Sequence, residues 1–166
     1  FFEKADNKFL CPSCWGKDVL CGACNKDRFI FNRQLSKHFS LSEMTHSDVA
    51  VRNGLSNMPT QEIIDNIRLV CCDLLEPIRS KFGPIIVNSG YRSLAVNSAL
   101  GGSSKTSAHM LGFAADFVPY DKKIKLKTIF EWVASSNKLP TDQIIYEFGS
   151  WLHIGGRYSN ANPRKQ

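Results

Sequence analysis

The segment from residue 107 to residue 116 carries a histidine and an aspartate that could bind one metal ion. It reads SAHMLGFAAD, with His109 and Asp116 as the two candidate ligands. Imidazole and carboxylate are both good zinc ligands, and a catalytic zinc ion takes three protein ligands plus a water. We expect His109 on a loop and Asp116 on a strand. Small residues between them limit the side-chain bulk of the intervening segment. A third ligand must then come from elsewhere in the chain.

His153 is the best-placed third ligand, because it is a single polar residue within the late apolar strand expected at 151–154. The other histidines, His38 and His46, lie in polar stretches that we expect to be exposed. A lone histidine in an apolar strand is more often a hydrogen-bonded core residue, and a lone aspartate in a strand is often only an edge residue. The combination of all three residues makes a catalytic metal site the favoured interpretation.

This combination resembles the zinc D-alanyl-D-alanine carboxypeptidases and L-alanyl-D-glutamate endopeptidases, which include vancomycin-resistance-type enzymes and phage endolysins. The family pattern Ser-x-His-x-x-Gly-x-Ala-x-Asp is matched in full by residues 107–116. The resemblance covers about residues 39–160 and is closest to the short phage-type branch. Four other segments carry it as well: 75–79, 89–93, 142–147 and 151–154.

The resemblance implies a function as well as a site. His109, Asp116 and His153 would bind a catalytic zinc ion, which would activate a water for attack on a peptide bond. The substrate would be the peptidoglycan stem peptide, cut as by a D,D-carboxypeptidase or as by an L-Ala-D-Glu endopeptidase. Hedgehog-type signalling domains share this metal scaffold without catalysis. A non-catalytic, hedgehog-like zinc-binding module is therefore the alternative.

A carboxylate must accept the proton of the water and pass it to the leaving amine, and Glu147 is the candidate. Many family members place this acid three residues before the last histidine, where this chain has Ser150. A three-residue hairpin loop of residues 149–151 sets Glu147 opposite His153, on one face of the sheet. A two-residue loop puts the two side chains on opposite faces, and Glu147 would then be an exposed strand glutamate.

Two further polar residues match the family pattern. Arg92 could stabilise the oxyanion of the tetrahedral intermediate or hold a substrate carboxylate, and otherwise it is a surface arginine in a turn. Ser107 could hydrogen-bond the substrate or orient the His109 loop. Alternatively, it could be only a residue that favours a loop conformation. Tyr91 and Trp151 are more typical of packing residues than of substrate contacts.

The six cysteines are unevenly distributed along the chain. Two Cys-x-x-Cys pairs separated by six residues can build a tetrahedral four-thiolate zinc site, which would stabilise a segment too short to pack a core. Two disulfides or an iron–sulfur cluster are the alternatives. Residues 71 and 72 are adjacent cysteines on a helix stripe, and we expect free thiols there. The four paired residues are Cys11, Cys14, Cys21 and Cys24.

The elements that must position these residues form an irregular series of helices and strands. Apolar spacings of three and four predict an amphipathic helix from residue 63 to residue 82, with a kink near Pro77. A second helix is expected at 123–137. Such a series is typical of an α+β fold with a mainly antiparallel sheet, and the resemblance implies a hedgehog/DD-peptidase-like sheet flanked by helices. The expected strands are a buried one at 85–87, then 114–118, 144–148 and 151–154.

Length and composition predict one globular domain with a small appendage: 166 residues, 43% hydrophobic and 22% charged. We divide the chain into a Cys-rich zinc-knuckle appendage at 1–35, a zinc peptidase domain at 36–160 and a basic tail at 161–166. No stretch approaches the roughly 18 apolar residues of a membrane helix, and no signal-peptide core is visible.

The net charge of +6 suits an anionic partner such as a bacterial cell wall. A nucleic-acid partner is not expected, because the basic N-terminus lacks interleaved aromatic residues and a recognition helix. We therefore expect the protein to act at the bacterial cell wall. The sequence leaves open whether it is a phage-encoded lysin, a virion-associated part or a cellular enzyme, and it leaves the oligomeric state open.

Overall fold

A computed structural model describes residues 33–101, 104 and 106–156. The cysteines predicted to hold a second zinc ion, Cys11, Cys14, Cys21 and Cys24, lie outside the described residues, as does the basic tail at 161–166. The described residues contain both cysteines of the helix stripe. Cys71 is buried and Cys72 is exposed, and both are free thiols as predicted.

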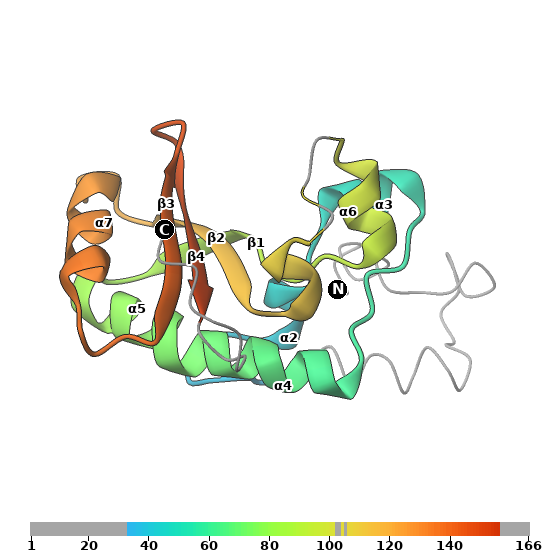
Figure 1. Cartoon of the computed structure of the whole chain (residues 1–166), viewed down its shortest axis with the longest axis horizontal. Coiled ribbons are helices and arrows are strands. Elements are labelled where there is room, and N and C mark those ends of the chain that lie inside the picture. The colour runs from blue at the N-terminus through green and yellow to red at the C-terminus, as the bar shows by residue number, and fades with distance from the viewer. Residues whose placement is uncertain (1–32, 102–103, 105, 157–166) are drawn as a thin grey trace, which may run out of the picture.

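A four-stranded antiparallel sheet lies at the centre of the described residues (Figure 1). The strand order is β1-β2-β4-β3, so the two outer strands are β1 and β3. This sheet and the helices that flank it confirm the predicted α+β class. The strands are β1 (Ile85–Ser89), β2 (Ala114–Pro119), β3 (Thr141–Glu147) and β4 (Trp151–Gly156).

The helices lie around this sheet, with α5 and α7 at one end of the molecule and α3 and α6 at the other (Figure 1). Helix α7 contacts β3 and β4, and the turn η3 contacts β2. The helices are α2 (Leu41–Met44), α3 (Asp48–Asn53), α4 (Gln61–Val70), α5 (Glu76–Phe82), α6 (Leu94–Ala99) and α7 (Leu126–Ser135); the irregular turns are η2 (Cys71–Leu75, π) and η3 (Ala108–Leu111, 3-10).

The predicted helix across residues 63–82 forms, and it is irregular close to Pro77 as expected, but the irregularity is a π turn. The chain stays helical from α4 through η2 into α5, and Pro77 lies in the first turn of α5. Immediately before it, the Glu76 N–H donates to the carbonyl of Cys71, which is a π-type bond. A π turn inserts one extra residue into the helix, and the first turn of the next helical segment tolerates a proline without a donor. The distortion expected near Pro77 therefore takes the form of a π turn at 71–75.

The core lies between the helices and one face of the sheet. The apolar stripe of α4, η2 and α5 packs there with residues of β2, β4 and α7. Strand β1 corrects the sequence prediction of a buried strand, because Ile86 is 45% exposed. The reason is that the core covers only one face of this strand, the face of Ile85 and Val87, and the side chain of Ile86 is on the other. Fully buried members of the core include Ile67, Leu74, Ile78, Phe117, Ile129, Leu152 and Ile154.

Candidate metal centre

The three predicted ligands come from three elements and meet at one point. His109 lies in η3, Asp116 in β2 and His153 in β4. The antiparallel register of β2 and β4 pairs Asp116 directly with His153. Gly112 ends η3 in the left-handed conformation, with φ of 74°, and turns the chain into β2. The sheet register and this turn together bring the three side chains together.

Two of the three ligand-atom separations match those of a tetrahedral zinc ion, and the third is about 0.5 Å shorter. His109 Nε2 lies 3.2 Å from His153 Nδ1 and 3.3 Å from Asp116 Oδ1. His153 Nδ1 lies 2.8 Å from the same carboxylate oxygen. Ligands about 2.0–2.1 Å from a tetrahedral ion are about 3.3 Å from one another. The residues present therefore fit a zinc ion held by two histidines and one aspartate.

A hydrogen bond fixes the orientation of the His109 ring. Its Nδ1–H donates to the carbonyl oxygen of Gly90 at 2.6 Å, which leaves Nε2 to face Asp116 and His153. The His109 side chain is only 1% exposed. Metal-bound histidines generally donate their other ring N–H in this way, because the bond sets the tautomer and the ring direction. Gly90 is therefore part of the architecture of the site.

The ionisation states suit metal binding. Burial lowers the pKa of His109, and the Asp116 carboxylate opposes this effect only in part, so the ring is neutral near pH 7. Burial raises the pKa of Asp116, but hydrogen bonds and electrostatic attraction from His109 and His153 outweigh it and hold this pKa well below its usual range. A neutral imidazole and an ionised carboxylate are the forms that bind zinc.

Arg92 lies beside this cluster. Its backbone N–H donates to the carbonyl of His109 at 3.2 Å. Burial lowers the pKa of the guanidinium, and the nearby Asp116 carboxylate partly offsets the effect. Its Nε atom is buried and has no hydrogen-bond partner among the described residues. The guanidinium as a whole is half-buried, so its accessible part is the group that a substrate carboxylate or a developing oxyanion would meet.

Asn57 holds the backbone on both sides of Arg92, a role that the sequence analysis missed. Its Nδ2 donates to the carbonyls of Thr45 and Tyr91, and its Oδ1 accepts from the Ser93 N–H at 2.7 Å. In the sequence this asparagine stands two residues before Pro59. No local signal could have found its role, because Tyr91 and Ser93 lie 34 and 36 residues away.

Glu147 lies on the same sheet face as His153, but the hairpin register differs from the expected one. The loop has three residues, 148–150 instead of 149–151, and Glu147 pairs with Trp151. Ile145 is the residue directly opposite His153. Because side chains alternate between faces, Glu147 is a diagonal neighbour of His153 on the same face. Such diagonal pairs lie about 7–8 Å apart, within reach of a long side chain.

Ser107 is half-buried at the start of η3, where its carbonyl accepts the Met110 N–H at 3.1 Å. Its side chain caps no backbone N–H of η3. His38 and His46 lie away from the metal cluster and pair with Glu76 and Asp48. Within the described residues, the three-residue cluster found by sequence is the one group with this ligand spacing.

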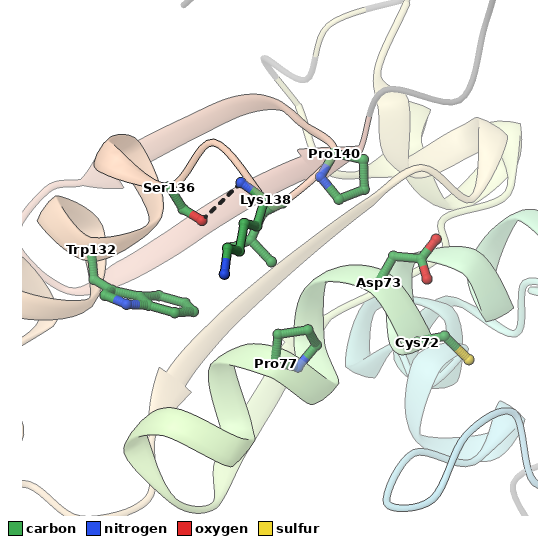
Figure 2. Close-up of a pocket in the computed structure, with 8 residues that line it drawn as sticks. Cys72, Asp73, Pro77, Trp132, Ser136, Lys138 and Pro140 are labelled. Carbon is green, nitrogen blue, oxygen red and sulfur yellow. Dashed lines mark hydrogen bonds between the residues drawn. The ribbon is translucent and has the colours of Figure 1, made fainter.

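A groove of about 430 Å³ lies apart from the metal cluster (Figure 2). Pro77 and Cys72 line one side of it, and Trp132 and Lys138 line the other (Figure 2). None of the metal-binding residues, Arg92 or Glu147 contributes to its lining. The groove therefore does not adjoin the candidate metal centre.

Replacing Gly90 with alanine is expected to destabilise the protein and weaken its metal site. The added Cβ would lie 2.9 Å from the carbonyl carbon of Met44 and would overlap its oxygen, which accepts the Tyr91 N–H. Overpacking against backbone typically costs about 1–3 kcal/mol. The shift would also displace the carbonyl that orients His109, and the loss of such support lowers metal affinity by about 10–100-fold. Urea unfolding and a zinc titration measure the two effects.

The matched control for this variant is Gly155→Ala. Gly155 lies in β4 near the same site, but its added Cβ would approach Gln143 Cβ no closer than 3.5 Å. We expect a change in unfolding free energy below about 1 kcal/mol. Equal effects of the two substitutions would contradict the close contact of Gly90 with Met44.

Comparison with known proteins places this site in a family. Residues 37–155 match the sequence pattern of the family described as peptidase M15. The fold and the site thus define an α+β peptidase with a candidate two-histidine, one-aspartate metal centre, and the chain belongs to the peptidase M15 family. This confirms the resemblance to zinc D-Ala-D-Ala carboxypeptidases at the level of the family. Searches of the curated proteins and of the solved structures found no match.

Family membership supports a zinc-dependent peptidase, and a peptidoglycan-type substrate goes with that family. Among the described residues, none of the helices combines the length and the apolar character needed to cross a membrane.

Proposed function

We propose that this protein is a zinc peptidase that cuts a peptide bond in the peptidoglycan stem peptide. The observation that carries the proposal is the convergence of His109, Asp116 and His153 at zinc-ligand spacing, on a sheet face shared with Glu147. The bond is either the D-Ala-D-Ala bond or the L-Ala-D-Glu bond. The place of action is the bacterial cell wall, whose anionic polymers would attract a chain of net charge +6.

Each residue has a defined role in this proposal. When bound, zinc brings the pKa of a coordinated water near neutrality and polarises a carbonyl. Glu147 accepts the proton of the attacking water and delivers it to the leaving amine. The half-buried guanidinium of Arg92 binds the developing oxyanion or a substrate carboxylate. The carbonyl of Gly90 holds the His109 ring in position throughout.

The test combines metal analysis with mass spectrometry of digested peptidoglycan. We expect zinc in the purified protein and new termini at L-Ala or D-Ala, both lost after treatment with a chelator and restored by added zinc. A zinc-loaded protein that binds peptidoglycan without cutting it would support the non-catalytic alternative instead.

A further inference from the structure

The tip of the β3–β4 hairpin carries an aromatic pair, an exposed Phe148 against a half-buried Trp151. Phe148 is 86% exposed, more than any other large apolar side chain among the described residues. Its ring contacts that of Trp151, with centroids 5.8 Å apart and planes inclined by 55°. The hairpin tip projects beyond the neighbouring helices (Figure 1). The ring of Phe148 therefore gains little from burial.

The backbone at Phe148 is also unfavourable for this residue. The Ser150 N–H donates to the carbonyl of Glu147 at 2.8 Å and closes a tight turn. Both central residues have positive φ, 50° at Phe148 and 71° at Gly149. Asn-Gly is the usual pair in such turns, and a bulky residue with positive φ is an outlier. Neither local conformation nor packing explains a phenylalanine here, and strain of this kind is typical of functional sites.

The aromatic pair is continuous with the candidate metal centre. Trp151 lies two residues before His153 in β4, so both side chains point to the same face of the sheet. Two residues of a strand span about 6.6 Å. Glu147, the proposed base, is the residue paired with Trp151. A substrate that runs from the metal along β4 toward the hairpin would therefore reach this pair.

We propose that Phe148 and Trp151 form a subsite for the sugar ring that carries the stem peptide. This inference rests on the proposed function and narrows its substrate. The stem peptide itself supplies alanine, acidic and diamino-acid side chains, none of them large and apolar. The pyranose ring is the one rigid group nearby with an apolar C–H face, and such faces pack against the electron-rich face of an aromatic ring.

The distance between the metal centre and the aromatic pair favours one of the two candidate bonds. In a cut at L-Ala-D-Glu, only the L-Ala residue and the lactyl group separate the reacting carbonyl from the sugar, about 7 Å in extended form. This length matches the distance from His153 to Trp151 along the strand. In a cut at D-Ala-D-Ala, four residues intervene and place the sugar more than about 13 Å away. The subsite therefore indicates an endopeptidase that cuts next to the glycan.

The test compares two substrates that differ only in the sugar: a disaccharide-linked stem peptide and the same peptide without sugar. The readout is the ratio of their kcat/KM values, with equilibrium binding of both ligands measured in parallel. We expect a ratio well above one for the unaltered protein and a fall of about fivefold in Phe148→Asn. Asparagine tolerates the left-handed conformation, so the melting temperature of this variant should not fall.

Tyr146→Ser is the matched control. Tyr146 is a half-exposed aromatic residue of the same hairpin, but it lies on the opposite face and contacts Phe130. We expect the ratio of its kcat/KM values for the substrates with and without sugar to equal that of the unaltered protein. A ratio near one in the unaltered protein, or an unchanged ratio in Phe148→Asn, would overturn the sugar subsite.

The remaining outcomes separate this inference from the proposed function. If both substrates are cut with no preference, the sugar subsite fails and the peptidase assignment stands. If neither is cut, the peptidase assignment fails. The ratio of the binding affinities for the ligands with and without sugar then still shows whether the sugar subsite exists. Loss of binding to anionic lipid vesicles in Phe148→Asn, with an unchanged sugar ratio, would identify the tip as a membrane contact and overturn the proposal.

Discussion

Asp116→Asn is expected to lose zinc and hydrolytic activity together. The Asp116 carboxylate lies within 2.8 Å and 3.3 Å of the two histidine nitrogens, and it is the one negative charge of the ligand set. Asparagine keeps the shape of the side chain but removes that charge. We expect zinc affinity to fall by more than about 100-fold and kcat/KM by more than about 1,000-fold. Zinc titration and a muropeptide assay measure the two losses.

Asp48→Asn is the control for this experiment. Asp48 also pairs with a histidine, His46, at 3.2 Å, but on an exposed part of α3 away from the metal cluster. Zinc content and activity should both survive that substitution. An Asp116→Asn variant that retained zinc in full would remove Asp116 from the ligand set.

Glu147→Gln is expected to separate catalysis from metal binding. Glutamine preserves the size of the side chain but cannot accept the proton of the attacking water. Loss of a general base typically lowers the rate by about 10²–10⁴-fold. Zinc content should stay that of the unaltered protein, because Glu147 pairs with Trp151 and is not one of the three ligands. Single-turnover kinetics with a muropeptide, together with zinc analysis, give both quantities.

Glu131→Gln controls for the loss of one negative charge. Glu131 is an exposed glutamate of α7 that lies 3.8 Å from Lys127, and its replacement should leave the rate unchanged. Full activity in Glu147→Gln would exclude this residue as the base. If the unaltered protein proves inactive on every wall peptide yet binds zinc, the non-catalytic alternative is the better description.

The identity of the site was accessible from the sequence because ligand chemistry is a property of side-chain type and spacing. His109 and Asp116 stand seven positions apart in a motif with small residues between them. His153 was recognisable as a single polar residue in an apolar strand. The same alternation of side chains placed Glu147 on the face of His153, since any loop with an odd number of residues does so.

The hairpin register was not accessible in the same way. Residues 149–151 form a reasonable loop by composition, whereas the actual loop of 148–150 requires a positive φ at Phe148. Local preference argues against that conformation in an aromatic residue. Likewise, the proline rule alone predicts an irregularity near Pro77 but not its form, a π turn at 71–75.

The sequence by itself determined the three candidate ligands, the helical stripe and the antiparallel α+β class, because each depends on side-chain chemistry or on short-range periodicity. Tertiary structure alone decided the supports of the site. The bond from His109 to Gly90 spans 19 residues, and the bond from Asn57 to Ser93 spans 36. In each of these bonds the partner of the side chain is a backbone group that every residue carries, so no residue type marks that partner in advance. Only the packing of η3, β1 and the loop before α4 brings these groups within hydrogen-bonding distance.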